Sequence, residues 1–269
     1  MVGYVGPPIR PAELVSAPPH SLYVQSYRPL EMTSGVVNAD GWGAALWLDD
    51  GEPEPAIYRT AAPIWADPNL RWIGERLRAR AALAAVRSAT PGIGYELSSV
   101  QPFGRERIGF LHNGFIQPWR GPASRRLLGG LGDAAYGSVQ GASDSEGIFA
   151  LVLDALERGP GSLASAVRTA VQRLGAICRE SEAQAVATIL VSDGAELVGC
   201  RQGFGRPPAS LYVAQAGPAT RAGRRALGWC MASEPLWSEG QGGTAFREVP
   251  AGSVAIARTG EELRLEGIE

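Results

Sequence analysis

Short apolar runs and longer amphipathic segments divide this chain, and together they predict a mixed α and β structure. Residues 81–86 and 107–111 are apolar runs of the length expected for buried strands. Residues 145–157 and 162–179 instead repeat apolar positions at helical spacing, and in the first of them Ile148, Phe149 and Leu156 belong to a wide apolar face. A further, shorter helix is predicted at 123–128.

The last third of the chain changes to strands and turns. The segments that fit the strand pattern, each bounded by Gly, Pro, Asp or Ser, are 185–191, 197–201, 211–213, 228–232 and 254–257. Strands, then helices, then strands again predict an α+β fold, a four-layer sandwich with two sheets between helical layers. The sequence contains no flexible linker, so residues 1–269 are expected to form a single domain.

Proline, glycine and capping residues give sharper local predictions near the N-terminus. A strand at 2–5 is expected to end at Gly6-Pro7-Pro8, because proline lacks the N–H that a sheet needs. Residues 22–27 are mixed, with an extended conformation as one option. A helix is predicted over 67–80, with Asp67 as its cap and Pro68 in its first position.

Composition narrows the function classes. The net charge of −2 lacks the basic excess typical of nucleic-acid or membrane-surface binding. Cys178, Cys200 and Cys230 are widely spaced, which fits buried free thiols better than a disulfide framework or a zinc site. With two histidines, a histidine-rich metal site is not expected, and no cofactor is indicated. No signal peptide or membrane-length run is visible, so a cytoplasmic protein is expected. The sequence does not indicate the oligomeric state.

Arg87 and Asp144 are candidate substrate-binding residues. Arg87 directly follows an apolar strand and precedes a small-residue loop, so its planar guanidinium is expected at a pocket rim, where it can bind a carboxylate with two hydrogen bonds. A surface ion pair is the ordinary alternative. Asp144 lies between Ser143 and Ser145, where a helix begins, and either a helix cap or a ligand for a substrate ammonium fits it. Together the two charges would suit the α-amino acid end of a substrate.

Asn113 and Gly114 follow the apolar run 107–111 and are candidate catalytic residues. Asn-Gly is also a strong turn signal, so an ordinary turn remains an alternative. The Asn side-chain amide and the Gly backbone N–H can bind one oxygen together, as in an oxyanion hole for acyl transfer. His112 beside them is either a general base or a structural histidine at the end of a strand.

These motifs resemble the class II glutamine amidotransferases of the N-terminal-nucleophile hydrolase family. The resemblance is carried by A-V-R-S-A-T around Arg87, H-N-G around Asn113, and S-D-S-E around Asp144. Further motifs, P-P-H-S-L, M-T-S-G, N-A-D-G-W-G, Q-P-F and A-S-E-P, are similar to the branch of the family that hydrolyses γ-glutamyl-hercynylcysteine sulfoxide in ergothioneine biosynthesis.

The resemblance implies an αββα sandwich and a mechanism that uses an N-terminal cysteine. The cysteine attacks the γ-glutamyl amide carbonyl, its α-amine relays the proton, and water resolves the thioester to release glutamate. The resemblance also implies that Arg87 holds the substrate α-carboxylate, Asp144 its α-ammonium, and Asn113 with Gly114 the oxyanion. Other γ-glutamyl compounds, such as glutathione-type peptides or glutamine, remain alternative substrates.

The opening of the chain departs from the family pattern, which begins Met-Cys-Arg, then two mostly apolar residues, then Gly-Tyr-x-Gly. Here the sequence begins Met1-Val2-Gly3-Tyr4-Val5-Gly6, which aligns without the Met-Cys-Arg segment. One expectation is that the native start lies three codons upstream and that the chain is inactive without it. The other is that the cysteine is lost and the fold survives as a γ-glutamyl-binding protein. The remaining cysteines are not expected to replace the nucleophile.

Overall fold

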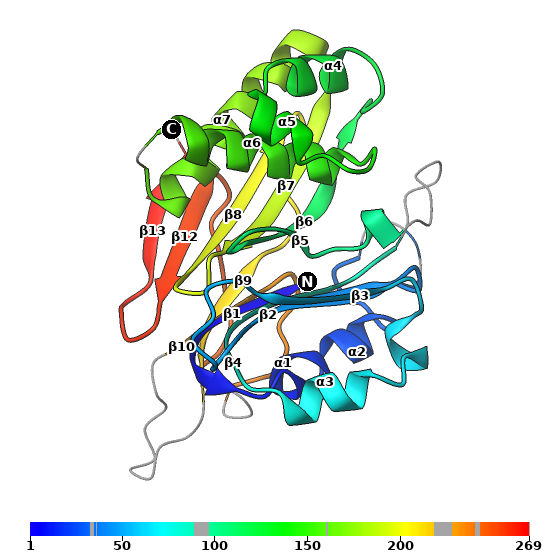
Figure 1. The fold of residues 1–269 in the computed structure, drawn as a ribbon, viewed down its shortest axis with the longest axis vertical. Helices are drawn as coiled ribbons and strands as arrows, with labels where there is room; N and C mark the ends of the chain where they lie inside the picture. The colour runs from blue at the N-terminus through cyan, green and yellow to red at the C-terminus, as the bar shows by residue number, and fades with distance from the viewer. Residues whose placement is uncertain are drawn as a thin grey trace.

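Four layers, helices on both outer faces and two antiparallel sheets between them, make up the molecule (Figure 1). The computed structural model describes residues 1–32, 35, 37–88, 97–159, 161–217, 228–239 and 243–268. Residues 33–34 of the M-T-S-G motif and 89–92 of the loop after Arg87 lie outside these ranges. No helix in the described ranges combines the length and the apolarity needed to cross a bilayer.

Sheet A contains the N-terminal strand at its centre. Its strand order is β11-β9-β10-β1-β4-β2-β3. The bounds are β1 (Val2–Ile9), β2 (Trp42–Leu48), β3 (Ala56–Thr60), β4 (Ala79–Val86), β9 (Tyr212–Ala216), β10 (Gly228–Ala232) and β11 (Arg247–Glu248). Because β1 pairs with β4 on one side and β10 on the other, Met1 lies inside the sandwich.

Sheet B has the order β13-β12-β8-β7-β6-β5. Its strands are β5 (Phe103–Arg105), β6 (Ile108–Gln117), β7 (Gln184–Ser192), β8 (Glu196–Phe204), β12 (Ser253–Arg258) and β13 (Arg264–Gly267). β5 pairs with only the first residues of β6, up to Phe110, so no strand of the described residues lies beside the rest of that edge of β6. This open edge is where the candidate site lies.

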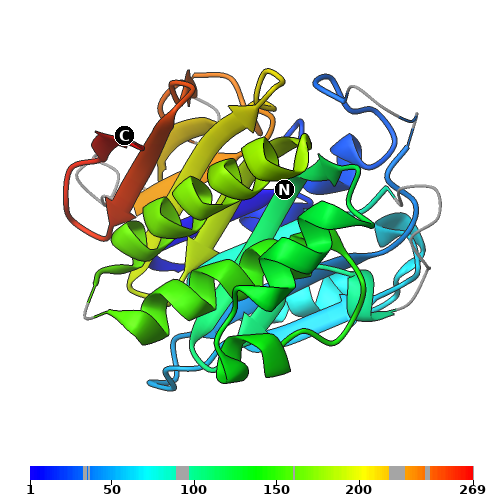
Figure 2. The ribbon, with the colours of Figure 1, turned by 90° about the horizontal axis from the view of Figure 1, so that it is seen from above.

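Helices cover the outer face of each sheet. Sheet A carries α1 (Ala12–Val15), α2 (Leu22–Gln25) and α3 (Leu70–Arg76), with a 3-10 turn at Ile64–Ala66. Sheet B carries α4 (Pro122–Gly129), α5 (Asp133–Gly137), α6 (Asp144–Arg158) and α7 (Leu163–Ser181). A second 3-10 turn, Leu97–Ser99, precedes β5. Figure 2 shows α6 and α7 lying side by side across sheet B.

Three buried clusters follow from this layering. One packs α1–α3 on sheet A, one packs α4–α7 on sheet B, and the third fills the space between the sheets. The alternation of β4 explains the division, because Leu83 and Ala85 face the inter-sheet cluster while Ala82 and Ala84 face the helices. The predicted α+β sandwich of two sheets between helical layers is confirmed.

Several local predictions were wrong in instructive ways. β1 continues past Gly6-Pro7-Pro8 to Ile9, because its register with β4 shifts after Val5 and so tolerates the prolines. Residues 22–25 form a helical turn, not an extended segment. The helix predicted over 67–80 covers only Leu70–Arg76, since Ala79 already belongs to β4. Asn69, not Asp67, directly precedes the helix; the Asp67 carboxylate accepts from the Asn69 N–H at 2.9 Å and also from Trp42 and Tyr58.

The two strands that carry candidate site residues run in the same direction across the inter-sheet space. Trp47, which pairs with Ala81 of β4, donates to the Arg107 carbonyl just before β6. Two residues further along each strand, Leu83 lies against Gly109. The C-terminal end of β4 and the second half of β6 therefore lie toward the same edge of the sandwich.

Candidate functional site

On the open edge of β6, the backbone N–H of Gly114 is free of described partners, while the N–H groups on either side of it are each bound by a side chain. Along this strand the even-numbered residues point their N–H groups away from β7. The His112 N–H donates to Gln101 Oε1 at 2.6 Å, and the Ile116 N–H donates to Asp144 Oδ2 at 2.7 Å. The N–H of Gly114 lies between these two, on the same edge, and no hydrogen bond from the described residues reaches it. It is available to an oxygen atom of a ligand.

Only glycine fits at position 114. Its φ of +156° is unfavourable for L-residues, and a Cβ built there would lie 1.9 Å from the Val186 carbonyl oxygen of β7. Asn113 beside it is exposed and follows Leu111 on the face of β6 that looks into the inter-sheet space. Both residues lie inside β6, so the prediction that they follow the end of a strand, as a turn would, was wrong.

His112 has a structural role on the other face of β6. It is buried, its Nε2 lies 2.9 Å from the Val186 carbonyl oxygen and its Nδ1 lies 2.8 Å from Ser145 Oγ. A carbonyl only accepts, so Nε2 carries the proton and Nδ1 accepts from the serine hydroxyl. Burial lowers the pKa of His112, although Asp144 opposes this. A neutral ring with both nitrogens engaged does not act as a general base.

Asp144 occupies the first position of α6, and Ser143 is the cap. Ser143 Oγ accepts from the Glu146 N–H at 3.1 Å, as an N-cap does. The buried Asp144 carboxylate reaches sideways to β6: Oδ2 binds the Ile116 N–H, and Oδ1 accepts from the Ser145 N–H at 2.8 Å. A carboxylate has acceptor capacity beyond these two bonds, so it can still receive a ligand ammonium.

Arg87 directly follows the last residue of β4 and is half-buried. Its backbone is held on both sides by the loop that opens β2: the Arg87 N–H donates to Gly41 at 2.9 Å, and the Asp40 N–H donates to the Arg87 carbonyl at 3.0 Å. The same loop reaches the end of α2, where the Asn38 N–H donates to Ser26. The position of Arg87 is thus fixed by three separate segments.

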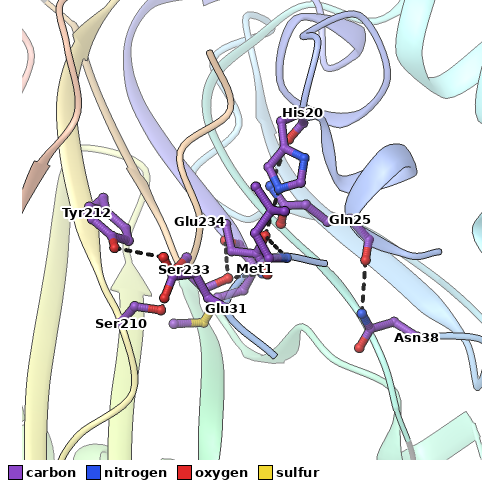
Figure 3. A network of polar contacts seen from close by, with 10 residues as sticks. Met1, His20, Gln25, Glu31, Asn38, Ser210, Tyr212, Ser233 and Glu234 are labelled. Carbon is purple, nitrogen blue, oxygen red and sulfur yellow. Dashed lines mark hydrogen bonds and ion pairs between the residues drawn. The ribbon is translucent and has the colours of Figure 1, made fainter. Parts of the chain in front are cut away.

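A polar network surrounds the N-terminus on the sheet A side (Figure 3). The α-amine of Met1 is buried and donates to Ser233 Oγ at 2.9 Å. Next to Ser233, Glu234 lies 2.7 Å from His20 Nε2 and accepts from the Leu30 N–H at 2.9 Å. Burial lowers the pKa of the α-ammonium to about 6, a shift that the charge of Glu234 partly offsets.

The three cysteines are inert at neutral pH. All are free and buried, as the sequence predicts. Burial raises the pKa of Cys178 to about 11 and of Cys200 to about 12, and it raises the pKa of Cys230 as well. Among the described residues, no three His, Cys, Asp or Glu side chains are grouped so that they could hold a metal ion.

The motifs of this edge occur together in one known family. The sequence profile of the class-II glutamine amidotransferases matches residues 19–216, which contain Arg87, Asn113, Gly114 and Asp144. This chain belongs to the class-II glutamine amidotransferases. It is 39% identical over 155 residues to a protein of Mycolicibacterium smegmatis named gamma-glutamyl-hercynylcysteine sulfoxide hydrolase, covering 58% of this chain and 64% of the relative. A Mycobacterium tuberculosis protein of the same name is 37% identical, with 62% of its length covered.

Further comparisons agree on the family and the fold. A probable glutamine amidotransferase of Saccharomyces cerevisiae is 33% identical over 156 residues, covering 56% of this chain and 43% of that protein. A class-II domain protein from Silicibacter pomeroyi has a TM-score of 0.66 at 23% identity, covering 99% of this chain and 97% of that one. The glutamine phosphoribosylpyrophosphate amidotransferase of B. subtilis has a TM-score of 0.61 at 18% identity, covering 100% of this chain and 49% of that one.

The four predicted site residues lie at three places in the structure: Arg87 directly after β4, Asn113 and Gly114 in the second half of β6, and Asp144 at the start of α6. Asn113 and Gly114 adjoin Asp144 through the Ile116 N–H, and Arg87 follows a strand that runs in the same direction. Sequence reasoning did not predict the roles of Gln101, Ser233 and Glu234. Their only signals were the short motifs Q-P-F and A-S-E-P. Ser233 and Glu234 have partners 232 and 214 residues away, while Gln101 binds His112, 11 residues away, through a contact that no helix or strand spacing indicates.

Proposed function

We propose that this chain binds the γ-glutamyl group and, with a cysteine at its N-terminus, hydrolyses the γ-glutamyl amide of γ-glutamyl-hercynylcysteine sulfoxide to release glutamate. The observation that carries the proposal is the Gly114 N–H, which is open between two bound neighbours and lies beside the exposed Asn113 amide. Two such donors on one oxygen stabilise a tetrahedral intermediate, and each contributes about 3–4 kcal/mol in enzymes of this kind.

The charged residues divide the recognition of the glutamyl head between them. The Arg87 guanidinium binds the α-carboxylate, for which its planar fork of donors is suited. Asp144 receives the α-ammonium with the lone pairs that the Ile116 and Ser145 N–H groups leave unused. The γ-carbonyl oxygen then points at Asn113 and Gly114, so binding and catalysis use adjacent parts of one edge.

The register of sheet A predicts where a preceding cysteine would lie. Val2 pairs with Ala84 of β4 and with Ala232 of β10, and the Ser233 N–H donates to the Met1 carbonyl. Continuing the antiparallel pairing two residues ahead of Met1 puts the cysteine opposite Arg87. Its thiol would attack the γ-carbonyl carbon, its own α-amine would take the thiol proton and pass it to the departing amine, and water would hydrolyse the thioester.

The test compares the chain that begins at Met1 with a variant carrying Met-Cys-Arg ahead of it, from which the first Met is removed so that the cysteine has a free α-amine. We expect glutamate release from γ-glutamyl-hercynylcysteine sulfoxide only with the added segment, and no release when the added cysteine is replaced by alanine. Arg87→Ala should weaken binding of L-glutamate to either protein, measured by calorimetry, by about 10- to 100-fold, because a charge-assisted pair is lost.

Each contrary outcome points to a defined alternative. Faster release from glutathione or glutamine than from the sulfoxide would make this a hydrolase of other γ-glutamyl compounds. Saturable glutamate binding without turnover by the extended protein would make it a γ-glutamyl-binding protein. Turnover by the chain that begins at Met1 would refute the need for a terminal cysteine.

A further inference from the structure

We propose that Gln101 is a positioning residue that holds the oxyanion-binding peptide of Gly114 in place by acting as a substitute for a missing strand. The inference rests on the proposed function of Asn113 and Gly114, and it assigns a role to the Q-P-F motif. Gln101 itself touches neither Asn113 nor the Gly114 N–H; it acts through the intervening peptide of His112.

If the pairing of β5 with β6 continued beyond Phe103 and Phe110, Gln101 would lie opposite a residue of β6. Phe103 of β5 pairs with Phe110 of β6, and two residues further along this antiparallel register Gln101 lies opposite His112. Pro102 lies between them and has no N–H, and backbone pairing does not continue to this position. The side-chain amide of Gln101 takes over instead: Nε2 donates to the His112 carbonyl at 2.9 Å, and Oε1 accepts from the His112 N–H at 2.6 Å.

A primary amide matches a peptide group in having one acceptor oxygen and N–H donors, so these two bonds reproduce a pair of ladder hydrogen bonds. The backbone of Gln101 is itself held against sheet A, where a Cβ on Gly43 of β2 would lie 2.5 Å from the Gln101 carbonyl oxygen. On the far side of Gly114, Asp144 fixes the Ile116 N–H in the same way. The backbone is therefore held by a hydrogen bond on each side of Gly114, while the Gly114 N–H itself has no described partner.

These hydrogen bonds limit the motion of Gly114, and the limit is needed because glycine is the residue whose backbone rotates most freely. Without Gln101, the His112 N–H and carbonyl lose their partners, and nothing on that side keeps the following peptides extended. The Gly114 N–H would then spend part of its time turned away from the oxyanion. A donor contributes to the rate only while it is preorganised toward the developing charge. The expected loss is in turnover, because the hydrogen bonds of the Gln101 side chain within the described residues go to His112, whereas Arg87 and Asp144 would hold the glutamyl head.

The experiment replaces Gln101 by leucine, with Gln172→Leu as the matched control. Gln172 also donates through its side-chain amide to a backbone carbonyl, that of Ile268, but from α7 and away from the site. In the protein carrying Met-Cys-Arg, we expect Gln101→Leu to lower kcat by about 10- to 1,000-fold, the upper end matching full loss of one oxyanion donor. KM should change less than about threefold, and Gln172→Leu should change neither.

A second readout does not need turnover. In the chain that begins at Met1, amide hydrogen exchange and the ¹H–¹⁵N resonances of His112 and Gly114 should change in Gln101→Leu and not in Gln172→Leu. If Gln101→Leu does not fold, Gln101→Glu decides the matter: it keeps the acceptor for the His112 N–H but puts a second oxygen against the His112 carbonyl in place of the donor, so kcat should fall and the amide resonances of His112 and Gly114 should shift.

Unchanged amides at His112 and Gly114, or a loss that appears in KM alone, would overturn the role of Gln101. Absence of glutamate release from every extended protein would instead overturn the proposed function, while the amide measurements would still decide whether Gln101 fixes the Gly114 peptide.

Discussion

The two sides of the site are built differently. On the sheet B side, His112 and Ile116 are bound by Ser145 and Asp144, only 33 and 28 residues away in sequence. On the sheet A side, Met1 contacts Ser233 and His20 contacts Glu234, across 232 and 214 residues. The first side depends on one strand and one helix start. The second forms only when the N-terminal segment meets the residues that follow β10, and it responds to ionisation, because a buried amine lies within it.

The largest effect we expect comes from Gly114→Ala on the sheet B side. The new methyl group would meet the Val186 oxygen, and the backbone angle of +156° is strained for alanine. We expect the free energy of unfolding to fall by about 3–5 kcal/mol, as for severe core clashes. Urea denaturation followed by circular dichroism measures it.

Gly129→Ala is the matched control for this substitution. Gly129 lies in α4, and nothing lies within 4 Å of the place where its Cβ would be. There alanine should be neutral or should stabilise by up to about 1 kcal/mol, because glycine is the poorer helix former. If the two variants lose similar stability, the close approach of Gly114 to β7 does not explain why glycine is needed there.

The next effect concerns pH and the sheet A side. The α-amine of Met1 has a pKa of about 6 in the folded chain and an ordinary value of 8.0. Between these values the unfolded chain holds a proton that the folded chain does not, so stability should rise as pH increases from 6 to 8. The rise from this group should be about 2–3 kcal/mol. His112, whose pKa is lowered from 6.5, shifts stability in the same direction at lower pH.

The variant with Met-Cys-Arg separates the two groups. In it the Met1 nitrogen becomes a neutral peptide N–H, which is less costly to bury than an ammonium group. We expect the part of the rise that comes from the Met1 amine to disappear there, while the contributions of His112 and of the cysteine's own α-amine remain. Urea titrations at several pH values, on protein whose mass confirms that Met1 is retained, measure the difference. An equal pH dependence in both proteins would contradict the assignment to Met1.

The contrast between the two sides also explains what could be predicted from the sequence. The layers follow from local patterns, because the apolar run of β4 and the amphipathic face of α6 are visible residue by residue. Asn113, Gly114 and Asp144 stand in short motifs beside those elements. Glu234 was missed because a hydrogen bond to His20, 214 residues away, has no signature in spacing. Gln101 was missed although His112 is only 11 residues away, because a side-chain amide that pairs with a strand backbone follows no helix or strand period.

The wrong predictions have the same physical cause. Asp67 has the sequence context of a helix cap and accepts from the Asn69 N–H, but Trp42 and Tyr58 of neighbouring strands also bind its carboxylate. The helix begins only at Leu70. Pro7 and Pro8 look like a strand end, yet Tyr4 and Arg78 bind their carbonyls, and the register shift relieves their missing N–H groups. In each case a tertiary contact outweighs the local propensity.

The smallest effect is expected from Glu234→Gln, which weakens the sheet A side without touching sheet B. The buried Glu234 carboxylate holds both His20 and the Leu30 N–H, so removing its charge should cost about 1–2 kcal/mol in the free energy of unfolding. Glu75→Gln is the control, since its exposed pair with Arg71 should contribute less than about 0.5 kcal/mol.

Because Glu234 also raises the pKa of the Met1 amine, its loss should extend the pH-dependent range below 6. If Glu234→Gln lowers the free energy of unfolding no more than Glu75→Gln does, the contacts of Glu234 with His20 and Leu30 do not stabilise the sheet A side.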